Sequence, residues 1–129
     1  MSAKDIAQAA ITAWEAKDVN SLSSCLSENF AGRGFLPQQI EKQQFIDLMK
    51  VLTTAFPDWS FGAHLLTEQD DTALFVTHIT GTHTGDLILP TLPLVLPTGQ
   101  KISLPDRHMT CTLGGDKITA MTMDYPVSL

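Results

Sequence analysis

Four histidines are the residues of this chain that could most directly bind a metal or move a proton, and they stand at positions 64, 78, 83 and 108. His78 and His83 are five residues apart, and on a regular strand an odd separation directs two side chains to opposite faces. The chain has no HExxH motif, no cysteine cluster and no histidine pair at helical spacing. We therefore expect no metal site and no cofactor. His83, inside "GTHTG", is expected to bond backbone or threonine groups at a strand end.

The last predicted hairpin offers an alternative, an acid–base site made of Asp106, His108 and Asp124. If the "GGD" turn is a three-residue loop that places Leu113 opposite Lys117, these three residues share one face of the hairpin. The other face is apolar and should point to the core, which sends the three polar residues outward unless a bulge turns one inward. The apolar face comprises Arg107, Met109, Cys111, Leu113, Met121, Met123 and Tyr125.

Nucleophilic catalysis has less support in the sequence. No GxSxG motif occurs, and Cys25 and Cys111 stand alone, outside any recognisable activating context. Two cysteines without CxxC spacing are typical of buried free thiols in a reducing compartment. The stretches "GRG" and "GGD" match no phosphate-binding loop, so we expect them in turns.

The composition describes one globular domain over residues 1–129, with 43% hydrophobic and 17% charged residues. A formal net charge of −6 without a basic stripe argues against a nucleic-acid partner. The longest apolar stretch, "DLILPTLPLVLP", is interrupted by prolines and too short to cross a bilayer, and the first residues do not resemble a signal peptide. We expect a cytoplasmic protein that contacts neither nucleic acid nor membrane.

Helical periodicity is confined to the first 56 residues. Ser2 is a plausible cap for a first helix that ends near Asp18, and "DVNSLSSCLSENF" is expected to form a short second helix before a turn at "AGRGF". A third helix is predicted from about Gln38 to the residue before Pro57.

Beyond Pro57 the period changes to that of strands. Residues 58–85 are predicted to form two strands around "EQDD", and residues 101–125 two more around "GGD". Helices followed by strands indicate an α+β domain with an antiparallel sheet and the helices on one face. The loop over residues 86–98 is apolar and rich in proline, and we interpret it as either a pocket lid or an oligomer contact.

The order of these elements, together with "FPDW", "GTHTG", "PTGQKI" and "GGDKI", resembles the SnoaL-like polyketide cyclases of the nuclear transport factor 2-like superfamily. The resemblance implies a cone-shaped curved sheet, three helices on its concave face, an enclosed pocket and a homodimer. It also implies acid–base residues at two positions of the last strand, which here are Met121 and Met123. The acid of related steroid isomerases corresponds to Met109. A thioether cannot relay a proton at neutral pH, so the mechanism of the family does not transfer at these positions.

Two functional hypotheses remain open. The first is a cofactor-independent cyclase or isomerase acting on an apolar carbonyl compound, with Asp124 as base and His108 or Tyr125 as its partner. The second is a non-catalytic protein that binds a hydrophobic small molecule in a methionine-rich pocket. In both, His83 shapes the pocket rim. The predicted pocket residues are Trp14, Met49, Trp59, His83, Arg107, Met109, Met121, Met123 and Tyr125.

Overall fold

The helices begin where capping side chains are available. The computed structural model describes residues 2–36, 38–88 and 96–124. Helix α1 (Ala3–Glu15) is capped by Ser2, whose hydroxyl accepts a hydrogen bond from the Asp5 N–H at 3.3 Å. Helix α2 (Val19–Cys25) is capped by Asp18, and helix α3 (Lys42–Ala55) ends before Pro57.

Two strands were not predicted at all. Residues Leu26–Arg33, which the sequence placed in the second helix and the turn after it, form strand β1, and Ile40–Glu41 form the short strand β2 before α3. The apolar residues Leu22, Leu26 and Phe30 are spaced by four, which suits a helix. Leu22 lies in α2, whereas Leu26 and Phe30 lie in β1, and all three are buried. Because residues i and i+4 also share one face of a strand, the spacing is compatible with either form.

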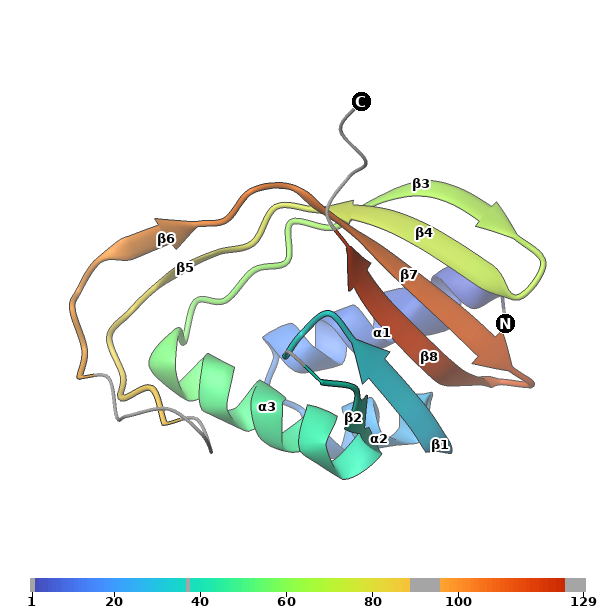
Figure 1. Ribbon diagram of the computed structural model, residues 1–129, viewed down its shortest axis with the longest axis horizontal. Helices are drawn as coiled ribbons and strands as arrows, with labels where there is room; N and C mark the ends of the chain where they lie inside the picture. The colour runs from blue at the N-terminus through green and yellow to red at the C-terminus, as the bar shows by residue number, and fades with distance from the viewer. Residues whose placement is uncertain (1, 37, 89–95, 125–129) are drawn as a thin grey trace.

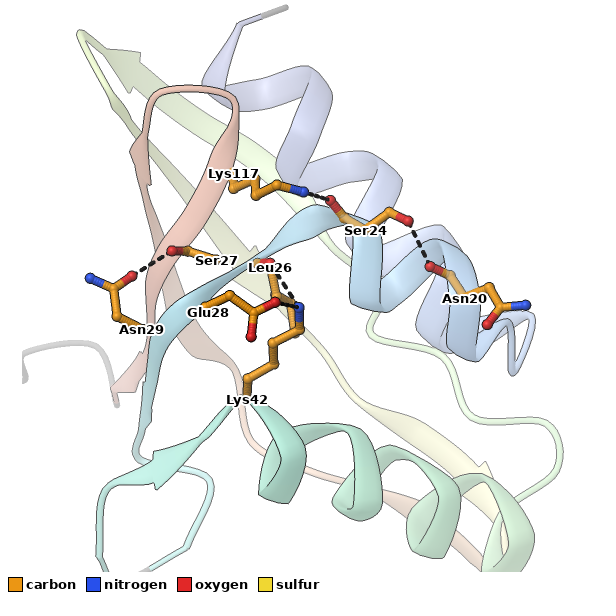
Figure 2. A network of polar contacts seen from close by, with 8 residues as sticks. All are labelled: Asn20, Ser24, Leu26, Ser27, Glu28, Asn29, Lys42 and Lys117. Carbon is orange, nitrogen blue, oxygen red and sulfur yellow. Dashed lines mark hydrogen bonds and ion pairs between the residues drawn. The ribbon is translucent and has the colours of Figure 1, made fainter.

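Polar contacts hold the direct junction between α2 and β1 (Figure 2). The Lys42 ammonium donates to the Leu26 carbonyl and lies 3.2 Å from the Glu28 carboxylate. The Lys117 ammonium donates to the backbone carbonyl of Ser24 at 2.8 Å. The Ser24 hydroxyl donates to the backbone carbonyl of Asn20 at 2.9 Å. Groups from α3 and from the last hairpin therefore satisfy carbonyls where the helix stops.

A six-stranded curved sheet has the order β2-β1-β8-β7-β4-β3, and the helices cover one of its faces (Figure 1). The remaining strands of this sheet are β3 (His64–Gln69), β4 (Thr72–Thr77), β7 (Arg107–Gly114) and β8 (Lys117–Asp124). Because β1 pairs with β8 in parallel, the sheet is mixed and mostly antiparallel, whereas the sequence predicted an antiparallel one. The α+β class and the three helices are confirmed.

The turn of the last hairpin is shorter than predicted. Gly114 pairs with Lys117 and Leu113 with Ile118, and a bulge at Thr119 takes up the difference. The bulge restores the predicted alternation, so Met109 pairs with the buried Met123.

Strands β5 (Thr80–Thr82) and β6 (Lys101–Ser103) form a two-stranded arm that extends beyond the sheet toward the end of α3 (Figure 1). The strand predicted from residue 101 onward is divided by Pro105, which lacks an N–H for the ladder. The Asp58 carboxylate accepts hydrogen bonds from the N–H and the hydroxyl of Thr82, and these bonds hold the pKa of Asp58 below its usual value. Asp58 thereby connects the "FPDW" and "GTHTG" motifs. The residues at the centre of the predicted lid, 89–95, lie outside the described part of the chain.

The two cysteines differ in accessibility, although both are free thiols. Burial raises the pKa of the Cys111 thiol to about 12, and burial also raises the pKa of the less enclosed Cys25. Iodoacetamide at about pH 8 is therefore expected to alkylate Cys25 in the folded protein and to leave Cys111 unmodified. Peptide mass spectrometry checks this, with both thiols reacting in urea as the control. Equal labelling of the two cysteines without urea would contradict the burial of Cys111 in β7.

Candidate functional site

A cavity of about 130 Å³ lies where the arm leaves the sheet. The helices contribute Trp14, Leu48 and Leu52 to its wall. Strands and the segments between them contribute the other side chains, which are Phe35, Trp59, Phe61, Ile79, Leu104, Arg107 and Met123. Most of these side chains are apolar, so the cavity suits an apolar molecule.

Two indole groups are among the polar features of this wall. The rings of Trp14 and Trp59 have centroids 6.1 Å apart, and Trp14 is only 2% exposed. Both Nε1 atoms are buried, and neither donates a hydrogen bond to any acceptor in the described residues. A buried donor without an acceptor costs about 1–3 kcal/mol, so such groups in a native protein call for an explanation.

Arg107 adds a fixed positive charge to the wall. Its Nη2 donates to the Gly34 carbonyl at 2.9 Å and to the Met123 carbonyl at 3.1 Å. These bonds connect the segment after β1 to the end of β8. A guanidinium has five N–H donors and no acceptor, so Arg107 can attract electron-rich groups.

Four of the predicted pocket residues line the cavity: Trp14, Trp59, Arg107 and Met123. Three other predicted pocket residues lie in the packed core instead, namely Met49, Met109 and Met121. Met109 and Met121 line only a void of about 10 Å³, and the Met49 sulfur lies 3.8 Å from the Thr53 hydroxyl. Tyr125 lies outside the described residues.

Six lining residues were not predicted, namely Phe35, Leu48, Leu52, Phe61, Ile79 and Leu104. Leu48 and Leu52 were recognised as part of the apolar stripe of the third helix. The sequence contains no signal that separates a side chain beside a cavity from one that fills a core, because both are apolar.

His83 is buried away from this cavity. It is 5% exposed, its Nδ1 lies 3.2 Å from the Thr98 hydroxyl, and its ring centroid is 5.1 Å from that of Phe56. Its backbone N–H donates to the Gln100 carbonyl. His83 directly follows β5, and its ring is hydrogen-bonded to Thr98, in line with the prediction from "GTHTG". His83 is not among the cavity-lining residues, so it does not shape the rim of this cavity.

Asp124 and His108 form a directly opposed pair in the β7–β8 ladder. Asp124 is exposed, His108 is half-buried, and neither lines the cavity. The bulge that could have turned Asp124 inward lies at Thr119, toward the opposite end of the strand. The catalytic roles of Asp124 and His108 stay predictions, because neither side chain lines the cavity formed by the described residues.

Asp106 belongs to a second polar cluster. Its carboxylate lies 2.8 Å from His78 Nδ1, and His78 Nε2 lies 2.8 Å from the Ser103 hydroxyl. The order of groups is that of a serine-hydrolase triad. However, the His78 and Asp106 side chains are 52% and 60% exposed, and water weakens such bonds. We interpret these hydrogen bonds as a structural connection between the arm and the residue before β7.

Two further structural findings concern metal binding and membrane insertion. Within residues 2–36, 38–88 and 96–124, no group of three or more histidine, cysteine or acidic side chains could hold a metal ion. In the same part of the chain, no helix has the length and apolar character needed to span a membrane.

A curved, mostly antiparallel sheet covered on one face by three helices defines an α+β cone. The chain belongs to the SnoaL-like polyketide cyclase family, whose pattern it matches over residues 4–120. The resemblance inferred from its motifs is therefore confirmed.

Solved structures show the same fold at low sequence identity. A proposed polyketide cyclase from Pseudomonas putida has a TM-score of 0.78 at 18% identity, with 98% of this chain and 93% of that chain covered. A proposed SnoaL-like polyketide cyclase from Jannaschia has a TM-score of 0.76 at 21% identity, over 94% and 83% of the two chains. AclR from Streptomyces galilaeus, a proposed hydroxylase, has a TM-score of 0.75 at 19% identity, over 96% and 74%. No curated protein matches the chain.

Proposed function

We propose that this protein binds a small hydrophobic molecule in the cavity at the base of the arm. The observation that carries the proposal is the cavity itself, which combines an apolar wall with a few buried polar groups. Ligand sites of soluble proteins typically have this composition. The volume of about 130 Å³ is close to that of engineered cavities of roughly 150 Å³ that hold benzene, so the ligand is about one ring in size.

Binding without acid–base chemistry is supported by the side chains at the positions where the family has its catalytic residues. Met121 is packed in the core, and Met123 lines the cavity. Neither thioether can accept or deliver a proton at neutral pH. Among the described residues, Arg107 is the only titratable side chain in the wall.

The proposal is tested by titrating the protein with isopropylbenzene in a calorimeter. Saturable binding is expected, and Leu52→Phe should weaken it more than tenfold because the larger ring fills the cavity. Leu66→Phe is the matched control, since Leu66 is 53% exposed on β3 and should leave binding unchanged. Equal affinity in all three proteins would show that the probe binds elsewhere.

Family membership supports the alternative, a cyclase or isomerase with Asp124 as its base. The two proposals predict different results for one variant, Asp124→Asn. Under the binding proposal Asp124→Asn keeps its affinity for the ligand, because Asp124 is exposed on the other face of the hairpin. Under the enzyme proposal the same variant loses turnover while it remains folded. The homodimer and the cytoplasmic location implied by the resemblance and the sequence also stay proposals.

A further inference from the structure

Two hollows inside the protein share a wall. The cavity of about 130 Å³ lies on one side of this wall, and the void of about 10 Å³ beside Met109 and Met121 lies on the other. Among the described residues, Trp14 and Phe61 are the only two that line both hollows. Their rings meet edge to face, with centroids 5.2 Å apart and planes inclined by 66°. The two side chains therefore stand between the cavity and the void.

Resting on the proposed function, we propose that Phe61 determines the size of the ligand, because together with Trp14 it forms a partition that limits the ligand to one ring. The ligand class is a single-ring hydrophobic compound, and a compound with two fused rings is excluded. The partition also keeps the ligand away from Met109 and Met121, which stand where the resemblance places acid–base residues. A bound ligand then contacts Met123, which lines the cavity.

Hydrogen bonds fix the backbone of Phe61. Its N–H donates to the Glu15 carboxylate at 2.8 Å, and its carbonyl accepts a hydrogen bond from the His78 N–H at 2.9 Å. Glu15 directly follows Trp14 at the end of α1, so one helix end supplies a ring of the partition and holds the other ring in place. Gly62 permits the close approach, since a Cβ there would lie 2.6 Å from the His78 carbonyl oxygen.

Packing fixes the ring of Phe61 as well. Phe61 is 3% exposed, and its ring centroid lies 5.2 Å from that of Trp14 and 5.7 Å from that of Trp59. Interiors are packed at the density of organic crystals, so a ligand does not easily push such a ring aside. The void behind it has room for about one water molecule at most. Truncation of Phe61 should join the void to the cavity, because the neighbours of a removed ring relax only partially.

The native protein is tested with isopropylbenzene and 2-isopropylnaphthalene, which differ by one fused ring. The chain contains five methionines, and isotope-labelled methyl groups give one signal for each in a carbon–proton correlation spectrum. Isopropylbenzene is expected to move the methyl signal of Met123 by its ring current and to leave those of Met109 and Met121 nearly unchanged. The two-ring compound should bind at least about tenfold more weakly, because it overfills the cavity.

Phe61→Ala removes the ring from the partition and should reverse this preference. The affinity for 2-isopropylnaphthalene is expected to rise at least about tenfold over that of the native protein, because the second ring buries apolar surface in the joined space. The methyl signal of Met121 should then move when this compound binds. Phe61→Leu should give the same changes to a smaller extent, and it provides the test if Phe61→Ala does not fold.

Phe35→Ala is the matched control, because Phe35 lines the cavity but not the void. It removes the same ring from another part of the cavity wall and leaves the partition in place. Neither compound should therefore move the Met121 signal in this variant. Movement as large as in Phe61→Ala would overturn the assignment of the partition to Phe61.

The outcomes distinguish this inference from the proposed function. If isopropylbenzene moves the Met109 and Met121 signals of the native protein as much as that of Met123, no partition exists, and hydrophobic binding still stands. Unchanged affinity of the Phe61 variants for 2-isopropylnaphthalene leads to the same conclusion. If neither compound binds the native protein, both proposals are wrong.

Discussion

Met121→Glu is expected to destabilise the fold by about 3–5 kcal/mol near neutral pH. This change introduces an acid–base group at one of the two positions where the resemblance implies one, with little change in side-chain length. Met121 is 3% exposed and pairs with the buried Cys111. Its neighbours around the void of about 10 Å³ are apolar, so the described wall holds no cation to pair with the new charge.

The loss of stability in Met121→Glu should depend on pH. Burial raises the pKa of a carboxyl above its unfolded value of about 4.3. Between those two pKa values the folded state binds more protons than the unfolded state, so stability falls as the pH rises. Urea unfolding at about pH 4 and about pH 7 is expected to show the larger loss at the higher pH.

Met121→Gln is the matched control for this experiment, because it has the same shape and does not titrate. The difference between the glutamate and glutamine variants isolates the cost of the charge. A glutamate variant as stable as the glutamine variant at both pH values would contradict the burial of this position. It would mean that water reaches the site, and acid–base chemistry there would then deserve a new test.

Gly34→Ala is expected to cost about 2–4 kcal/mol of stability. Gly34 has a φ of +85°, which favours glycine, and a Cβ at this position would lie 1.9 Å from the Met123 carbonyl oxygen. That oxygen also accepts a hydrogen bond from Arg107, as does the Gly34 carbonyl. The backbone at the cavity wall must move to relieve the contact, so ligand affinity should fall as well.

Gly115→Ala is the control for the backbone conformation alone. Gly115 has a similar φ of +70° in the β7–β8 turn, and no atom lies within 4 Å of a Cβ built there. This variant should cost only about 1–2 kcal/mol and leave ligand affinity unchanged. Urea unfolding and the isopropylbenzene titration measure both quantities. Equal effects of the two substitutions would show that the close approach of Gly34 to β8 is absent.

Local patterns were sufficient for most of the fold. Helical spacing together with the capping residue Ser2 predicted where the first helix begins, because a cap satisfies the free N–H groups within one turn. Alternation in the last hairpin predicted which side of it is buried, even though the turn differs from the predicted one. Burial of apolar groups determines that pairing, so a bulge compensates for the shorter turn.

Strand β1 could not be predicted from local patterns. The spacing of Leu22, Leu26 and Phe30 fits a helix, whereas pairing with the neighbouring strands β8 and β2 favours the extended form over Leu26–Arg33. A parallel partner that lies far away in the sequence supplies the hydrogen bonds, and no local pattern contains that information.

For the candidate site, the sequence by itself determined the chemistry that is present and much of what is missing. It placed methionines at the acid–base positions of the family, and it predicted the outward direction of Asp124 from the alternation of the hairpin. Only the tertiary structure decided that Met121 fills the core while Met123 borders a cavity. It also brought Trp14 and Trp59, which are distant in the chain, to one wall. The physical reason is that packing of elements distant in the chain determines where a cavity remains, and apolar residues beside a cavity have the same sequence pattern as those in a filled core.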